Sequence, residues 1–327
     1  MAKVFVTGGS GFVGRELIRT LVGAGDQVAA LARSAQAARV VSELGAQVVM
    51  GDLSSKPEMK IGMAGSMVVF HCAADVSTWG PVARIAKVNV EGTRNVIECA
   101  RDVGVPRVVH VSTEAVMVSG EPLVQMDETR PLPERNIGVY STTKAAAERV
   151  VRAMNGHGIE CVIVRPRFVW GQGDTTVLPA FVAAAKGGGF PFIGGGEQLT
   201  STCHVLNLVE GMLLAAERGK PGETYFLTDG PAVTVRRFVT DMLATQGVKA
   251  GNRVIPYWLA VLMAHILELS WKALALKGAP PLTRAVVELF GREVTVSDAK
   301  ARRELGYRGQ MTHAAGLAEM RGPSSIG

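Results

Sequence analysis

Two side chains that could together move a proton, Tyr140 and Lys144, stand four residues apart in a stretch with a helical pattern. On a helix, residues i and i+4 lie on the same face one turn apart, so this spacing places a phenol beside an ammonium. A free tyrosine has a pKa of about 10 and is a poor acid or base at neutral pH. Lowering that pKa by about three units needs about 4 kcal/mol, which a nearby cation and a positively charged bound group could supply. The pair indicates general acid/base chemistry, but the spacing is common by chance and needs support from the rest of the chain.

Two hydroxyl side chains, Ser112 and Thr113, end the apolar run 105–112 ahead of Tyr140. A hydroxyl at this point could hydrogen-bond a substrate oxygen and orient it towards the phenol. Serine and threonine at strand ends are also ordinary turn residues, so both interpretations stay open here.

Three glycines near the start of the chain, Gly8, Gly11 and Gly14, follow a predicted strand at 3–7 and open a predicted helix at 12–22. The first would allow a tight turn, the second a close approach of the backbone to a pyrophosphate, and the third packing of the helix against the sheet. The helix N-terminus would then face the phosphates with free N–H groups and the positive end of its dipole. Placed between a strand and a helix, this motif predicts a dinucleotide-binding site.

The residues after the second predicted strand bear on which dinucleotide binds. An NAD site usually carries an Asp or Glu here for the ribose diol, but no acidic residue occurs between Asp26 and Glu43. Arg33 with Ser34 could instead grip a 2′-phosphate, and Arg15 could assist. The sequence therefore favours NADP(H) over NAD(H), unless Arg33 is only a solvated surface charge.

A carboxylate, Asp52, and its neighbour Leu53 follow the third predicted strand. An aspartate at a strand end can accept a hydrogen bond from an adenine amine. It could equally cap the next helix, so this position is ambiguous by itself.

The elements that must position these residues alternate regularly in the first half of the chain. Because the predicted strands are apolar throughout, they indicate a parallel sheet buried on both faces. The expected fold class is α/β, a doubly wound parallel sheet of the Rossmann type. Strands are expected at 3–7, 27–32, 47–50, 67–72, 105–112 and 159–165, with helices at 12–22, 34–44, 82–103 and 140–154.

Beyond about residue 166 the pattern changes, and glycine-rich loops and helices dominate. We therefore expect an NADP-binding domain at 1–165 and a smaller, mostly helical substrate-binding lobe at 166–327, interleaved with the first. The lobe would close over the carboxyl ends of the strands, where such sheets bind ligands. Its helices are expected at 206–217, 235–245, 257–276 and 281–290.

Composition excludes several other classes of protein. The 327 residues carry 35 basic and 29 acidic side chains, and no basic run interleaves with aromatic residues, which argues against nucleic-acid binding. The uncharged run 254–267 is shorter than the roughly 20 residues of a transmembrane helix, so we expect a cytoplasmic protein, with contact to a membrane surface left open. No metal site is expected, because none of the cysteines has metal-ligand spacing and buried, reduced thiols are the simpler interpretation. The cysteines are Cys72, Cys99, Cys161 and Cys203.

Taken in order, these motifs resemble the extended short-chain dehydrogenase/reductase superfamily, over essentially the whole chain. The resemblance is closest to the 3β-hydroxysteroid dehydrogenase branch, which includes sterol-carboxylate dehydrogenases and bacterial 2-alkyl-3-keto acid reductases. The superfamily features are the TGxxGxxG pattern of 7–14, Asp52, Ser112-Thr113, Tyr140-xxx-Lys144 and Arg165-Pro166. The branch features are segments 69–74, 88–93, 165–171 and 281–284.

The resemblance implies a role for each matching residue. Tyr140 would be the general acid/base, and Lys144 would lower its pKa and bind the nicotinamide ribose. Thr113, with Ser112 beside it, would hold the substrate oxygen. The full predicted cofactor-binding set is Gly8, Ser10, Gly11, Phe12, Val13, Gly14, Arg33, Ser34, Asp52, Leu53, Ala73, Ala74, Tyr140, Lys144 and Pro166.

Other positions are less clear from the resemblance. Asn89 would lie near the site, or would be a polar group on a helix surface. His204 and Asn207 fall in a segment that closes the lobe, and His204 is more often structural than catalytic. Glu114 and Met117 depart from the small or aromatic residues of many relatives, which puts the identity of the substrate in doubt.

The leading hypothesis is hydride transfer between NADP(H) and a secondary alcohol or ketone on a bulky apolar substrate, of the 3-hydroxysteroid or 3-keto acid type. One alternative is a nucleotide-sugar epimerase or dehydratase with bound NAD, and another is a non-catalytic NADP-binding scaffold. The family also implies a homodimer formed through a four-helix contact. The run 256–276 is apolar nearly all round a helix, which indicates burial in the core, in an oligomer or at a lipid interface.

Overall fold

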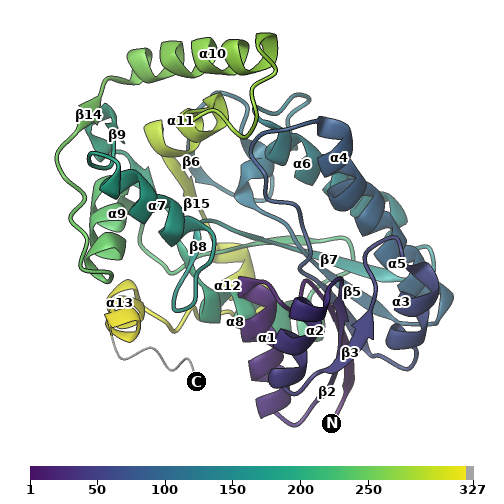
Figure 1. Ribbon diagram of the computed structural model, residues 1–327. Helices are drawn as coiled ribbons and strands as arrows, with labels where there is room; N and C mark the ends of the chain where they lie inside the picture. Colours follow the sequence, from purple (N-terminus) through teal and green to yellow (C-terminus); the bar gives the residue numbers. More distant parts are fainter. Residues whose placement is uncertain (322–327) are drawn as a thin grey trace.

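Seven parallel strands form the central sheet of the computed structural model, which describes residues 1–321 (Figure 1). The strand order is β12-β7-β5-β4-β1-β2-β3. Strands β1 to β3 are therefore added towards one edge of the sheet, and the strands from β4 onwards towards the other, so the order reverses between β1 and β4. The predicted doubly wound parallel sheet is confirmed. Its strands are β1 (Lys3–Thr7), β2 (Gln27–Ala32), β3 (Gln47–Met50), β4 (Val68–His71), β5 (Arg107–Val111), β7 (Glu160–Pro166) and β12 (Thr224–Leu227).

Helices bury both faces of this sheet, which is why its strands are apolar at every position. On β1, Val4 and Val6 join the core on one face, while Phe5 joins the core on the other. The first face is covered by α1 (Phe12–Gly23), α2 (Ala35–Glu43), α8 (Val205–Arg218) and α12 (Ala299–Leu305). The second is covered by α3 (Lys56–Met63), α5 (Gly92–Asp102) and α6 (Val139–Met154).

The long helix predicted at 82–103 is not regular along its length. It consists of α4 (Val82–Ala86), a π-helical segment (Lys87–Glu91) and α5, with no break in helical backbone at the joins. A π-helical turn widens the helix locally and is frequent at functional sites. Here it carries Asn89, which faces inwards and is 2% exposed.

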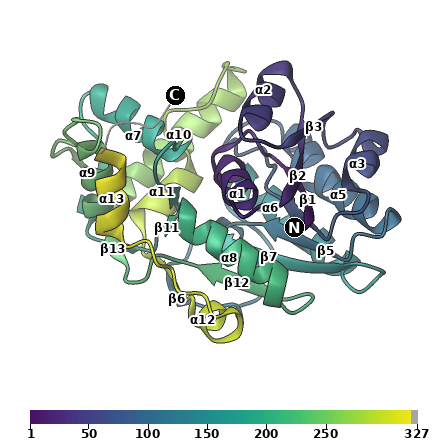
Figure 2. The same ribbon diagram turned by 90° about the horizontal axis from the view of Figure 1, so that it is seen from below.

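Parts of the C-terminal half return to the central sheet. β12 pairs with β7, and α8 and α12 pack on the sheet beside α1 (Figure 2). A separate core that includes Phe181, Phe190 and Phe238 lies in the rest of this half. The small sheets of this region join β13 (Val233–Thr234), β10 (Leu199–Thr200), β15 (Val294–Val296) and β6 (Leu123–Met126); β8 (Val169–Trp170) and β11 (Cys203–His204); and β9 (Phe192–Ile193) and β14 (Val254–Ile255). Its helices are α7 (Val177–Lys186), α9 (Val235–Ala244), α10 (Tyr257–Ala273), α11 (Arg284–Gly291) and α13 (His313–Arg321).

Helix α10 lies at the rim of the molecule, where it packs against α11 (Figure 1). Its buried positions are Ala260, Ala264 and Glu268, whereas Trp258 and Leu269 are 67% and 66% exposed. Burial in the core of this chain therefore does not account for its apolar composition. Within residues 1–321, no helix combines the length and the hydropathy that crossing a bilayer would require.

Candidate active site

The glycine-rich turn between β1 and α1 is packed so closely that side chains would not fit. Gly8 has a φ of +73°, and a Cβ there would lie 2.7 Å from the backbone nitrogen of Ala73. A Cβ on Gly14 would overlap the carbonyl oxygen of Gly8, so this glycine packs the helix against the turn itself. Gly11 precedes α1, and no side chain caps the first N–H groups of that helix. The turn therefore presents bare backbone donors and fits a pyrophosphate.

Arg33 and Ser34 follow β2 at this same edge of the sheet, and both are exposed. Among residues 1–321, no side chain or carbonyl group forms a hydrogen bond or ion pair with the Arg33 guanidinium. The Ser34 hydroxyl accepts a bond from the backbone nitrogen of Ala37 at 3.2 Å and so caps α2. Arg15 instead donates to the Gly173 carbonyl at 2.9 Å and so links α1 to the loop between β8 and α7.

Asp52 and Leu53 shape the segment between β3 and α3. The Asp52 carboxylate accepts bonds from the backbone nitrogen and the hydroxyl of Ser54, at 2.7 and 2.6 Å, and these bonds hold its pKa below the ordinary value. Its Oδ2 atom has no partner within residues 1–321, so the turn leaves one acceptor free. Leu53 packs against Gly92 of α5, where a Cβ would lie 2.6 Å from its Cδ1 atom.

The remaining predicted cofactor residues lie around the same turn or at the sheet edge. The backbone nitrogen of Ala73 donates to the Thr7 hydroxyl at 3.3 Å, which fixes the loop after β4 beside Gly8. Ala74 follows in this loop and is half-buried, and Pro166 is buried as the last residue of β7. Of the residues that open α1, Phe12 is buried, and Ser10 and Val13 are half-buried.

Tyr140 lies in the first turn of α6, next to the carboxyl end of β5. Helix α6 begins after Gly138, whose φ of +93° and contact with Ala285 leave no room for a side chain. Burial of the phenol raises the pKa of Tyr140 above its ordinary value. The negative charge of Glu114 adds to this rise, and a hydrogen bond with the Thr113 hydroxyl partly offsets it. The phenol is therefore a weaker acid here than a free tyrosine.

Lys144 lies one turn further along α6 and is 2% exposed. Its Nζ atom donates to the carbonyl of Val111 at 2.7 Å and lies 3.4 Å from Nε2 of His110. Burial lowers the pKa of Lys144 to about 8, against the opposing effect of Glu148. Within residues 1–321, the ammonium of Lys144 bonds to Val111 rather than to the Tyr140 phenol, so the predicted lowering of the phenol pKa by this ammonium stays a prediction.

The structure separates the two hydroxyls that are adjacent in the sequence. Thr113 donates to Oε2 of Glu114 at 2.8 Å and lies beside the Tyr140 phenol. Ser112 points the other way, and its hydroxyl donates to Glu148. Consecutive residues of an extended chain face opposite sides, so only one of the two can reach the phenol. Thr113 is the hydroxyl placed to act with Tyr140, whereas Ser112 is held by the core beneath α6.

Two buried ion pairs support this arrangement, and the sequence motifs do not identify either of them. Arg165 binds the carboxylate of Glu148 through two bonds of 2.8 and 2.6 Å. Arg167 binds Glu114, and it also donates to the Thr200 hydroxyl at 2.9 Å. Buried charges require such partners, because an isolated buried ion is costly. The sequence signals that could have indicated these ion pairs are Glu114, which follows the hydroxyl pair, and two arginines, Arg165 and Arg167, near the end of β7.

Asn89 connects the loop after β4 to the helix that carries the catalytic candidates. Its Oδ1 atom accepts a bond from the Asp75 nitrogen at 2.7 Å, and its Nδ2 atom donates to the Thr143 hydroxyl at 3.0 Å. Asn89 is thus buried and fixes the loop after β4 to α6 through these hydrogen bonds, and it is not a polar group on a helix surface. Farther away, Asn207 binds Asp229 at 2.7 Å, and the His204 ring stacks edge-on against Trp170 at 4.8 Å.

Comparison with known proteins decides the family. Residues 5–257 match the model of the 3-beta hydroxysteroid dehydrogenase/isomerase family. The chain belongs to this family. The branch predicted from the motifs is therefore confirmed, and so is the class of enzyme, an NAD(P)-dependent oxidoreductase acting on CH–OH groups.

Curated relatives of this family match over nearly full length. A ketoreductase of Stigmatella aurantiaca, named for 4-hydroxy-2-methyl-3-oxo-4-farnesyl-3,4-dihydroquinoline-1-oxide, is 50% identical and covers 99% of the chain and 98% of the relative. A 2-alkyl-3-oxoalkanoate reductase of Stenotrophomonas maltophilia is 34% identical and covers 99% of both chains. Among solved structures, a dTDP-glucose 4,6-dehydratase of Streptomyces venezuelae with NAD and TYD bound has a TM-score of 0.76 at 26% identity, covering 98% of this chain and 95% of the other. These likenesses agree with a nicotinamide cofactor.

Proposed function

We propose that this protein is an NADP(H)-dependent reductase that transfers a hydride to a ketone on a bulky apolar substrate. The observation that carries the proposal is that a phenol, Tyr140, and a neighbouring hydroxyl, Thr113, lie at the same carboxyl edge of the sheet as the bare backbone turn after β1. A neutral phenol is the form that donates a proton, so this arrangement is suited to ketone reduction.

The proposed cofactor fits the residues of this chain. The turn around Gly8 and the first N–H groups of α1 would bind the pyrophosphate, and Arg33 would bind the 2′-phosphate. Lys144 would bind the nicotinamide ribose through its ammonium group, which donates to the Val111 carbonyl in this structure. When bound, the reduced nicotinamide supplies a hydride for the carbonyl carbon.

The chain's own residues would handle the carbonyl oxygen. Tyr140 would donate its proton to that oxygen as negative charge develops there. The Thr113 hydroxyl, which donates to Glu114 in this structure, lies beside the Tyr140 phenol and would help to orient the substrate oxygen towards it. For the reverse reaction, the ammonium of Lys144 would stabilise the phenolate.

Relatives guide the choice of substrate. The ketoreductase at 50% identity carries a name that describes a ring ketone bearing a farnesyl chain, and the relative at 34% carries one that describes an open-chain keto acid. Since the first shares half of all positions, we propose a prenylated or similarly apolar ring ketone as the preferred substrate.

The test is NADPH oxidation by the purified protein, followed at 340 nm with a ketone panel. The panel should contain farnesyl-bearing quinoline ketones, 3-ketosteroids, 2-alkyl-3-keto acids and, for the alternative function, nucleotide sugars. We expect the highest kcat/KM with an apolar ring ketone. Turnover of nucleotide sugars without net NADPH consumption would contradict the proposal and favour an epimerase or dehydratase. Cofactor binding without turnover of any ketone or sugar would favour a scaffold.

We also propose that the exposed apolar side of α10 contacts an anionic lipid surface. Its exposed residues include Trp258, Leu262 and Ile266, and basic residues such as Arg253 and Lys272 stand near the two ends of the helix. A basic apolar helix of this kind binds anionic membranes. Co-sedimentation with phosphatidylglycerol vesicles tests this, and Trp258→Glu should reduce it without changing the melting temperature. Equal sedimentation of both proteins would contradict it.

Domain division and assembly are also part of the proposal. We propose a cofactor domain at 1–165 interleaved with a substrate lobe at 166–327, in a cytoplasmic homodimer formed by paired α5 and α6 helices. The exposed residues Arg94 and Arg149 of these helices are both cationic, so salt should screen their repulsion and favour such a contact. Light scattering at low and high salt measures the oligomeric state, and a monomer under both conditions would contradict the dimer.

A further inference from the structure

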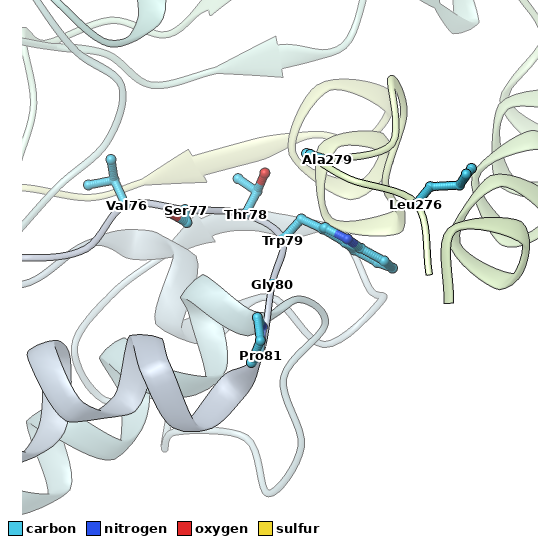
Figure 3. Close-up of a pocket in the computed structure, with 9 residues that line it drawn as sticks. Val76, Ser77, Thr78, Trp79, Gly80, Pro81, Leu276 and Ala279 are labelled. Atoms are coloured by element: carbon cyan, nitrogen blue, oxygen red, sulfur yellow. The ribbon is translucent and has the colours of Figure 1, made fainter. Parts of the chain in front are cut away.

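The ammonium of Lys144 is enclosed by the protein and has two acceptors within hydrogen-bonding distance among residues 1–321. Its Nζ atom donates to the Val111 carbonyl at 2.7 Å and lies 3.4 Å from Nε2 of His110. The cavity between the segment 76–81 and the loop that follows α10, with a volume of about 630 Å³, is lined by neither Lys144 nor His110 (Figure 3). The position of the ammonium therefore depends on buried groups of β5.

His110 lies on β5 and differs in its hydrogen bonding from the histidine beside it. His71 on β4 is its partner in the sheet register, and the two ring centroids are 5.2 Å apart. Both nitrogens of His71 are paired, with the hydroxyls of Thr7 and Thr93 at 2.7 and 2.9 Å. In His110, Nε2 has the contact with Lys144, but Nδ1 is buried without a hydrogen-bond partner among residues 1–321. His71 is thus fully paired, whereas His110 is paired only through Lys144.

The contact with an ammonium determines which nitrogen of His110 carries the proton. Burial and the positive charge of Lys144 lower the pKa of His110 well below its ordinary value, so the ring is neutral. Because an ammonium can only donate, Nε2 is the acceptor and the proton is on Nδ1. This leaves a buried N–H without an acceptor, which costs stability. A phenylalanine would fill this place without that cost, so packing alone does not explain a histidine here.

The two acceptors together fix the direction of the ammonium. It carries three N–H groups, and with one directed at the Val111 carbonyl and one at His110, the third keeps a single orientation. A lysine side chain is otherwise flexible, and ordering it when a ligand binds would lower the affinity. Glu148, one turn further along α6, does not replace His110 as an acceptor, because Arg165 binds its carboxylate through bonds of 2.8 and 2.6 Å.

We propose that His110 is a positioning residue of the active site, whose Nε2 atom accepts a hydrogen bond from Lys144 and so holds the remaining N–H of Lys144 available for the nicotinamide ribose. The inference rests on the proposed function, in which Lys144 binds that ribose. His110 is 1% exposed, so it would contribute to cofactor binding only through Lys144.

A double-mutant cycle tests this role by NADPH binding, without turnover. Dissociation constants are measured by fluorescence titration for the wild-type chain, His110→Phe, His110→Gln, Lys144→Met and the double variant that combines His110→Phe with Lys144→Met. His110→Phe keeps a ring and removes the acceptor nitrogen, whereas His110→Gln supplies an amide oxygen that can accept from Lys144. Lys144→Met keeps a long side chain without the ammonium. If His110→Phe does not fold, the smaller His110→Leu completes the same cycle.

We expect His110→Phe to weaken NADPH binding about two- to fivefold, which is the lower part of the range for one hydrogen bond because the contact is long. His110→Gln should bind NADPH as the wild-type chain does. Lys144→Met should weaken binding by at least as much as His110→Phe. Adding His110→Phe to Lys144→Met should cause no further loss, because His110 acts only through Lys144.

A purely structural role for His110 would give a different pattern. His110→Phe would then lower the melting temperature and weaken NADPH binding equally with and without the ammonium, and this result would overturn the proposal. Unchanged affinity in His110→Phe, or an equal loss in His110→Gln, would also overturn it. Complete coupling of the two residues without reduction of any ketone would count against the proposed function and leave the positioning role standing. Additive losses in a chain that reduces ketones would do the reverse.

Discussion

Replacing Arg33 by alanine tests how the chain distinguishes its two possible cofactors. Arg33 directly follows β2 and has no hydrogen-bond partner within residues 1–321, so its removal breaks no hydrogen bond and should leave the melting temperature nearly unchanged. A hydrogen bond between charged groups contributes about 1.5–3 kcal/mol. Because Arg33 is exposed and screened by solvent, we take the lower end of that range. We therefore expect the Kd for NADPH to rise about tenfold, since about 1.4 kcal/mol corresponds to a factor of ten.

The assay is fluorescence titration with NADPH and with NADH, for Arg33→Ala and for the control Arg39→Ala. Arg39 is also exposed but lies beyond the first turn of α2. The NADH affinity of Arg33→Ala should stay within twofold of the wild-type value, and the control should bind both cofactors normally. Equal losses for the two cofactors in Arg33→Ala would refute the reasoning, because Arg33 would then not contact the 2′-phosphate.

Two further predictions concern the turn and the phenol. Gly14→Ala should abolish cofactor binding and lower the melting temperature, because its Cβ would overlap the Gly8 carbonyl. The control Gly23→Ala, at an unobstructed position of the same helix, should be tolerated. Normal NADPH affinity in Gly14→Ala would contradict the close packing of this turn. Glu114→Gln should shift the pH profile of alcohol oxidation to lower pH, because Glu114 raises the pKa of Tyr140 and the oxidation needs the phenolate. Ketone reduction, which needs the protonated phenol, should stay level through neutral pH in the wild-type chain; an unshifted oxidation profile in a folded Glu114→Gln protein would contradict this role.

The sheet and the glycine turn were predictable because their signals are local. Strands such as β1 place apolar residues on both faces, and three closely spaced glycines between a strand and a helix are typical of a nucleotide-binding turn. The sequence did not predict that β12 joins the central sheet. Its partner β7 lies about sixty residues earlier in the chain, and a short apolar run does not show which strand it pairs with.

The choice between Ser112 and Thr113 shows where sequence reasoning about the site ends. Both residues carry a hydroxyl, and only the direction of each side chain shows that Thr113 reaches the phenol while Ser112 donates to Glu148. The pairing of Glu114 with Arg167 was equally hidden, because 53 residues separate the two charges. Such contacts depend on tertiary packing and leave no spacing rule in the sequence.

The central claim is that Tyr140 donates the proton in NADPH-dependent ketone reduction. Its most direct test is the single-turnover reduction of an apolar ring ketone by Tyr140→Phe, which removes the hydroxyl and keeps the half-buried ring. Tyr307→Phe serves as control, because it removes a hydroxyl bonded to the Thr228 carbonyl elsewhere in the core. We predict that Tyr140→Phe lowers the rate at least about 100-fold with an unchanged Kd for NADPH, and that the control retains the wild-type rate. A Tyr140→Phe rate above a few per cent of the wild-type value would contradict the claim.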